Sequence, residues 1–65
     1  MTKLTADTIT DDQIQLLRDE AGEHGDLEQV DLCRLALGIT PTIAWNLTPY
    51  AARGRCADAI NNGNG

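Results

Sequence analysis

The stretch that decides the fold is TDDQIQLLRDEAGEHGDLEQVDLCRLALG, residues 10–38. It opens with a capping box, in which the Thr10 and Gln13 side chains can each bond the other residue's backbone amide. Ile9 and Ile14 flank the same cap at the positions of a hydrophobic staple. Two independent signals therefore predict that a helix begins directly after this cap.

The first predicted helix covers residues 11–24 and has two unlike sides. Ile14, Leu17 and Ala21 fall within about 60° of one another at roughly 100° per residue, which predicts a buried side. The opposite side is predicted to face water and carries one leucine among acids: Leu16 with Asp12, Asp19, Glu20 and Glu23. This pattern predicts a ridge of carboxylates along the helix.

A tight turn joins this helix to a second one. Gly25 can adopt the left-handed conformation that ends the first helix, and Asp26 with Gln29 repeats the cap pattern. The second helix, residues 27–37, carries apolar side chains on two sides and ends at Gly38. Apolar residues on two sides are typical of the middle layer of a domain. The two helices together predict a helical hairpin.

Two threonine-proline pairs organise the C-terminal half. Proline directly after a capping threonine is favoured at the start of a helix. Thr40-Pro41 therefore predicts a short helical turn near residues 41–46, and Thr48-Pro49 predicts a terminal helix over residues 49–61. The inward side of that helix is a stripe of mostly small residues: Ala52, Cys56, Ala59 and Ile60.

Residues 1–65 are predicted to form a single all-α domain. No stretch alternates polar and apolar residues over the length that a strand needs. The expected architecture is a small bundle of three principal helices, with flexible ends at about residues 1–8 and 62–65. A domain this short has one small core, so a deep, dry active site is not expected.

Charge is distributed unevenly along the chain. Residues 1–31 contain nine acidic and two basic residues, a net charge of −7, whereas residues 32–65 carry +2. Direct binding to nucleic acid needs a basic stripe, which this sequence lacks. A positively charged protein surface is the more natural partner. Without a signal peptide or a long apolar run, we expect a cytoplasmic protein that contacts no membrane.

The residues suited to chemistry are few and widely spaced. His24 stands where the first helix ends, and no motif places Cys33 or Cys56 beside it as a nucleophile. Zinc needs four ligands at paired spacings, which these three residues do not supply. We therefore expect no enzymatic activity, no metal and no cofactor. The cysteines are expected to be reduced core thiols; a disulfide, worth about 3 kcal/mol, is the alternative.

Two surfaces are candidates for partner binding. The first is the acidic side of the first helix, where Leu16 would be an apolar anchor within a polar rim. The alternative is a solvated face with no binding role. The second surface contains Trp45 and Tyr50, since such aromatics are enriched at interfaces. The alternative for Trp45 is a lid over the small core.

Residues 9–21, followed by Gly25-Asp26 and residues 30–37, resemble a type of short helical open reading frame found in bacteriophages and other mobile elements. Residues 52–60 resemble the terminal helix of that type. Small acidic proteins of this origin include anti-CRISPR proteins, which bind CRISPR effector complexes or their nucleases. The chain is similar to them in size, charge and inferred origin, and this resemblance assigns no role to individual residues.

The leading hypothesis is a phage inhibitor, an anti-CRISPR protein in the host cytoplasm. It would occupy a basic nucleic-acid-binding surface of a CRISPR effector complex and block DNA recognition. Asp12, Asp19 and Glu23 would pair with lysines or arginines, and Leu16 would anchor the contact. The alternative is a homodimeric regulatory or assembly module that uses the segment from Trp45 to Tyr50 and the apolar far side of the second helix.

Overall fold

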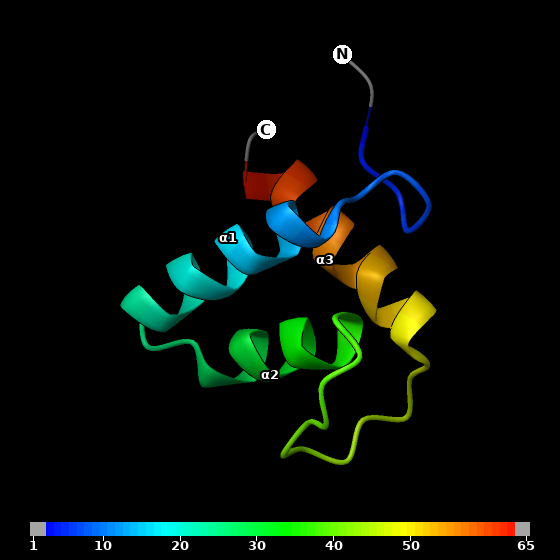
Figure 1. Ribbon diagram of the computed structural model, residues 1–65. Helices are drawn as coiled ribbons and strands as arrows, with labels where there is room; N and C mark the ends of the chain where they lie inside the picture. The colour runs from blue at the N-terminus through cyan, green and yellow to red at the C-terminus, as the bar shows by residue number, and fades with distance from the viewer. Residues whose placement is uncertain (1–2, 64–65) are drawn as a thin grey trace.

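The computed structural model describes residues 3–63, and these form three helices (Figure 1). Helix α1 spans Asp11–Glu23, α2 spans Leu27–Ala36 and α3 spans Pro49–Gly63. No strand occurs within the described residues. The predicted all-α bundle is confirmed, and the helix ends lie within two residues of their predicted positions.

The local signals in the sequence form the expected contacts around α1. The Gln13 amide donates to Thr10 Oγ1 at 3.2 Å, and the Thr10 amide donates to Gln13 Oε1 at 2.8 Å. Ile9 and Ile14 are both buried in the core on either side of this cap. The capping box and the staple therefore fix the start of α1 together.

The first two helices end at the glycines that the sequence predicted to end them. Gly25 has a φ of 73° and Gly38 a φ of 81°, both in the left-handed region that side-chain-bearing residues rarely adopt. The Gln29 amide donates to Asp26 Oδ1 at 3.2 Å, which caps α2. The chain therefore reverses after α1 with few residues and starts α2 at once.

Helix α2 is the middle layer, as its two apolar sides predicted. It packs against both α1 and α3, whereas α1 and α3 contact each other far less. Figure 1 shows α1 and α2 running side by side in opposite directions, with α3 crossing them. The buried core combines residues from all three helices and from the segment before α1: Ile9, Ile14, Leu32, Cys33, Ala36, Ala52, Cys56 and Ala57.

Small side chains allow α3 to lie close to α2. Ala52, Cys56 and Ala57 are fully buried, whereas Ala59 and Ile60 are only half-buried. The contact side of α3 is therefore rotated toward Ala57 relative to the predicted stripe. Ala59 and Ile60 therefore line surface depressions, although Ile60 also packs against the core.

The prediction of a short helical turn near residues 41–46 is wrong. This segment consists of bends, and its amides serve a different acceptor. The Thr42 and Ile43 amides donate to the carboxylate of Asp31 at 2.8 Å and 2.7 Å. A helical turn would have directed these amides along its own axis, so the buried carboxylate prevents it.

The N-terminal segment, placed by the sequence in a flexible end, is held against α3. The Leu4 amide donates to Asn61 Oδ1 at 3.1 Å, and Asn61 Nδ2 donates back to the Leu4 carbonyl at 2.9 Å. Leu4 also packs on the core. Residues 62–63 of the second predicted flexible end belong to α3, whereas residues 1–2 and 64–65 lie outside the described residues. None of the helices within residues 3–63 is both long and apolar enough to span a bilayer.

Candidate protein-interaction site

The outer side of α1 is a cluster of exposed carboxylates, which we call the acidic face: Asp12, Asp19, Glu20 and Glu23. Within residues 3–63, the carboxylates that have ion-pair partners are two others. Asp31 pairs with Arg34 at 3.9 Å and Asp11 with Arg53 at 2.8 Å. The carboxylates of the acidic face therefore form no ion pair within residues 3–63, although Arg18 and Arg34 line a surface depression beside Asp19 and Glu23.

Leu16 stands among these carboxylates, as the helical spacing predicted. Leu16 is 64% exposed, because it lies on the opposite side of α1 from the fully buried Ile14. A single exposed leucine needs no explanation on its own. Its neighbours on α3 are what make this one informative.

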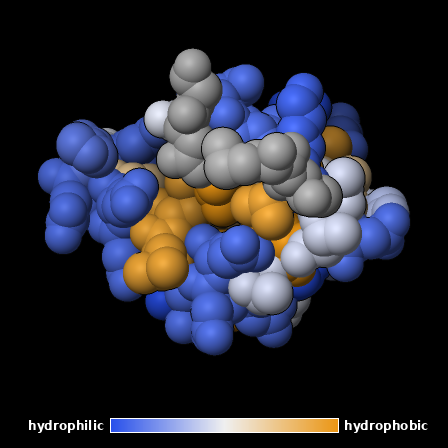
Figure 2. Space-filling model, turned by 90° about the horizontal axis from the view of Figure 1, so that it is seen from above, coloured by the Kyte–Doolittle hydropathy of each residue, from blue (hydrophilic) through white to orange (hydrophobic). Residues whose placement is uncertain are grey.

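A shallow groove runs between α1 and the C-terminal end of α3, with a volume of about 300 Å³. Figure 2 views the molecule from the side of the α1 start and the α3 end, and shows an apolar area there between hydrophilic side chains. The groove is lined by Gln13, Leu16, Leu17, Glu20, Ala59, Ile60 and Gly63. The exposed leucine thus belongs to a depression with mixed polar and apolar lining that two helices form together.

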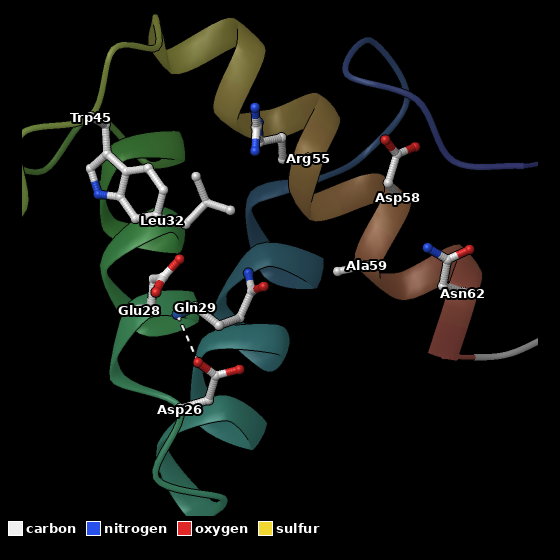
Figure 3. Close-up of a pocket in the computed structure, with 9 residues that line it drawn as sticks. All are labelled: Asp26, Glu28, Gln29, Leu32, Trp45, Arg55, Asp58, Ala59 and Asn62. Carbon is white, nitrogen blue, oxygen red and sulfur yellow. Dashed lines mark hydrogen bonds between the residues drawn. The ribbon is translucent and has the colours of Figure 1, made fainter.

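A second, larger cleft of about 690 Å³ lies between α2 and α3 (Figure 3). Its lining carries three carboxylates, one guanidinium, two amides and three apolar side chains: Asp26, Glu28, Asp58, Arg55, Gln29, Asn62, Leu32, Trp45 and Ala59. The sequence did not predict this cleft, because it exists only through the angle at which α3 crosses α2. Its polar, negatively charged lining suits a hydrated, cationic group better than an apolar one.

Asp31 is a buried carboxylate whose role was not recognised from the sequence. Burial by itself would raise the pKa of Asp31, but four hydrogen bonds outweigh it and lower the pKa to about 2. The donors are the Thr42 and Ile43 amides, the Trp45 indole nitrogen at 2.9 Å and the Thr42 hydroxyl at 2.9 Å. This carboxylate therefore organises the whole connection between α2 and α3.

The second candidate surface, Trp45 with Tyr50, is divided between two different tasks. Trp45 is half-buried against the core and uses its indole nitrogen on Asp31. Tyr50 is 58% exposed, and its hydroxyl donates to Asp7 Oδ1 at 3.0 Å. Trp45 lines the cleft between α2 and α3, whereas Tyr50 ties the N-terminal segment to α3.

Of the three residues considered for catalysis, the histidine lies apart from the two cysteines. His24 is exposed at the end of α1, whereas Cys33 and Cys56 are fully buried between α2 and α3. The two sulfur atoms are 3.9 Å apart. Among residues 3–63, no group of three or more histidine, cysteine, aspartate or glutamate side chains is arranged to hold a metal ion.

Comparisons of the chain with protein families, with curated proteins and with solved structures found no match. The interpretation of the site therefore rests on its own geometry and charge.

Proposed function

We propose that the chain is a protein-binding module that uses the acidic face of α1, together with the groove beside Leu16, to bind a positively charged protein surface. The observation that carries the proposal is the position of Leu16. It is 64% exposed, it lines a groove shared with Ile60, and the carboxylates around it have no ion-pair partner within residues 3–63. An apolar centre within a charged rim is the usual anatomy of an interface.

The charged rim and the groove would have separate roles in binding. Lysines or arginines of the partner would approach the carboxylates, which speeds the encounter and selects against acidic surfaces. An apolar partner side chain would then enter the groove between Leu16 and Ile60 and exclude water there. Such a buried contact contributes most of the affinity, whereas exposed charge pairs contribute little.

The more specific form of the proposal is an anti-CRISPR inhibitor. A nucleic-acid-binding surface offers a dense row of cations for phosphates, and the carboxylates of the acidic face supply anions to the same cations. Together with the resemblance to short phage proteins, this makes a CRISPR effector complex the first partner to test. Inhibition would follow from competition, since the bound module would cover the surface that DNA must reach.

A pair of matched charge reversals tests the acidic face. One variant combines Asp19→Lys with Glu23→Lys, and the other combines Glu28→Lys with Asp58→Lys in the cleft on a different side. Both raise the net charge by the same amount, and all four positions are exposed. We expect the first variant to weaken binding to a purified effector complex about tenfold or more, and the second less than about threefold. Equal losses would mean that net charge alone matters.

A second matched pair tests the groove. Leu16 and Leu27 are the two most exposed leucines of the described chain, at 64% and 75%, but only Leu16 lines the groove. We expect Leu16→Ala to weaken binding about tenfold, as removal of a buried interface leucine does, and Leu27→Ala to leave it unchanged. If the two variants bind equally well, the groove is not the site.

The anti-CRISPR assignment needs its own measurement. A purified effector complex is incubated with increasing amounts of the chain, and target DNA binding and cleavage are measured. We expect the effector to lose DNA binding as the chain is added. Added salt should weaken this inhibition, because the contact between the chain and the effector is electrostatic in part. An effector that binds and cleaves DNA normally at saturating chain would exclude this partner while leaving other basic protein surfaces to be tested.

The homodimeric module remains the second candidate, because apolar side chains are exposed near Trp45. Ile39 and Ile43 are 40% and 42% exposed on the connection between α2 and α3. Sedimentation of the purified chain distinguishes the two candidates. A stable dimer that Ile43→Asp converts to monomer would favour the homodimer, whereas a monomer at high concentration favours the partner-binding module.

A further inference from the structure

The two cysteines meet at the centre of the molecule, although 23 positions separate them in the sequence. Cys33 comes from α2 and Cys56 from α3, and each side chain has no exposed surface. Their sulfur atoms lie 3.9 Å apart, in the direct contact of a weak hydrogen bond. They are the only cysteines of the chain, so neither has a competing intramolecular partner.

The surroundings of the pair favour a bond between the two sulfurs over other thiol chemistry. Ala36, Ala52 and Ala57 belong to the same core cluster and keep α2 and α3 close. A disulfide needs the sulfurs to approach to about 2 Å, a shift that small side-chain rotations on two contacting helices can supply. His24, the one imidazole of the chain, is exposed at the end of α1 and is not part of this core cluster.

Cys33 is the cysteine of the pair that has a polar neighbour at the cleft between α2 and α3. Gln29 Nε2 donates to Cys33 Sγ at 3.6 Å, and Gln29 also lines the cleft between α2 and α3 (Figure 3). The hydrogen bond from Cys56 lowers the pKa of Cys33, whereas the hydrogen bond to Cys33 and burial raise the pKa of Cys56. The hydrogen bond from Gln29 and the lowered pKa together favour Cys33 as the attacking thiolate, because the thiolate is the nucleophile.

We propose that Cys33 and Cys56 form an intramolecular disulfide that fastens α3 to α2 when the protein meets a small disulfide oxidant such as glutathione disulfide. Because Cys33 is fully buried, the reaction begins when a local opening of α3 from α2 exposes its thiolate. The Cys33 thiolate then attacks one sulfur of the oxidant and releases the first glutathione as a thiolate. Cys56, deprotonated, then attacks the sulfur of Cys33 in this mixed disulfide and releases the second glutathione. The protein loses two electrons and two protons, and the oxidant is reduced to two thiols.

The test uses the purified full chain, first reduced and then exposed to glutathione disulfide without denaturant. We expect an intact mass two hydrogen atoms lighter, no retained glutathione and no thiol left to alkylate. The oxidised protein should melt roughly 10–20 °C higher than the reduced one, because the bond closes a loop of more than 20 residues in the unfolded chain. Excess dithiothreitol should restore the original mass and melting temperature.

Cys33→Ala and Cys56→Ala serve as controls, each compared with itself under oxidising and reducing conditions so that the lost core contacts cancel. Neither should show the rise in melting temperature. The mass and alkylation measurements on the parent chain decide the outcome even if a variant does not fold. Stable glutathione adducts, disulfide-linked dimers, or a disulfide that forms only in urea or lowers the melting temperature would each overturn the proposal.

Discussion

Asp31 and the acidic face of α1 use the same functional group in opposite ways. Asp31 is buried, accepts four hydrogen bonds of 2.7–2.9 Å and lies 3.9 Å from the Arg34 guanidinium. Asp12, Asp19, Glu20 and Glu23 are exposed and have no ion-pair partner among the described residues. The carboxylate of Asp31 serves folding, whereas the four carboxylates of the acidic face form no ion pair within residues 3–63.

The contrast shows why net charge is a poor guide to function in this chain. Asp31 contributes to the charge of −7 in residues 1–31, yet its donors and the protein around it screen it from any partner. Of the other eight acids in residues 1–31, four lie on the acidic face of α1. The four predictions below test this division, beginning with the residue whose loss should matter most.

Asp31→Asn should cause the largest loss of stability. The amide keeps the shape of the side chain but places an N–H₂ group against donors, so at least one of the Thr42, Ile43 and Trp45 donors loses its acceptor. We expect the melting temperature to fall by more than about 10 °C in thermal unfolding followed by circular dichroism. The matched control, Asp19→Asn, should change it by less than about 3 °C. Similar changes of melting temperature in the two variants would refute the distinction between a buried carboxylate that stabilises the fold and exposed ones that do not.

Low pH should remove the stability that the ionised Asp31 carboxylate contributes in the parent chain. The pKa of Asp31 in the folded protein is about 2, below the ordinary value of a carboxyl group. Its stabilising effect is therefore complete above about pH 4 and is lost as the pH falls through about 2. We expect the melting temperature to decline over this window, and the decline to be smaller in Asp31→Asn. An equal decline in both proteins would assign acid unfolding to other groups.

Most of the fold could be predicted from the sequence, because its signals are local. The capping box at Thr10, the staple of Ile9 with Ile14 and the left-handed glycines at Gly25 and Gly38 each act within a few residues. The exposure of Leu16 followed from helical spacing alone. Such features depend on backbone geometry that neighbouring residues determine, so no knowledge of the tertiary structure was needed.

The features that escaped prediction depend on residues distant in the sequence. Asp31 was counted as one more acid of an acidic half, although its position among the apolar residues of α2 was a usable signal of burial. The helical turn near residues 41–46 was expected because its cap and proline were considered without that carboxylate. The groove beside Leu16 requires α3, whose rotation toward Ala57 is decided by packing.

Trp45→Phe should have an intermediate effect. It removes one donor from Asp31 but leaves the Thr42 and Ile43 amides in place. A hydrogen bond to a charged group contributes about 2 kcal/mol, and we expect a loss of that size in urea unfolding followed by circular dichroism. Combined with Asp31→Asn, the substitution should cost much less than it does alone, because the two residues act through one contact. Additive losses would show that the indole stabilises the protein by packing only.

Asp7 lies between the two extremes, since it is exposed and yet has a partner. The Tyr50 hydroxyl donates to Asp7 Oδ1 at 3.0 Å, and this hydrogen bond and the charge of Asp7 raise the pKa of Tyr50. We expect Asp7→Asn to lower the pKa of Tyr50 toward its ordinary value and to change the melting temperature by less than about 3 °C. Because the chain has one tyrosine, the absorbance of its phenolate reports this residue directly. Asp19→Asn should leave the titration unchanged; a Tyr50 pKa that is indifferent to Asp7 would place this carboxylate with the unpartnered acids of α1.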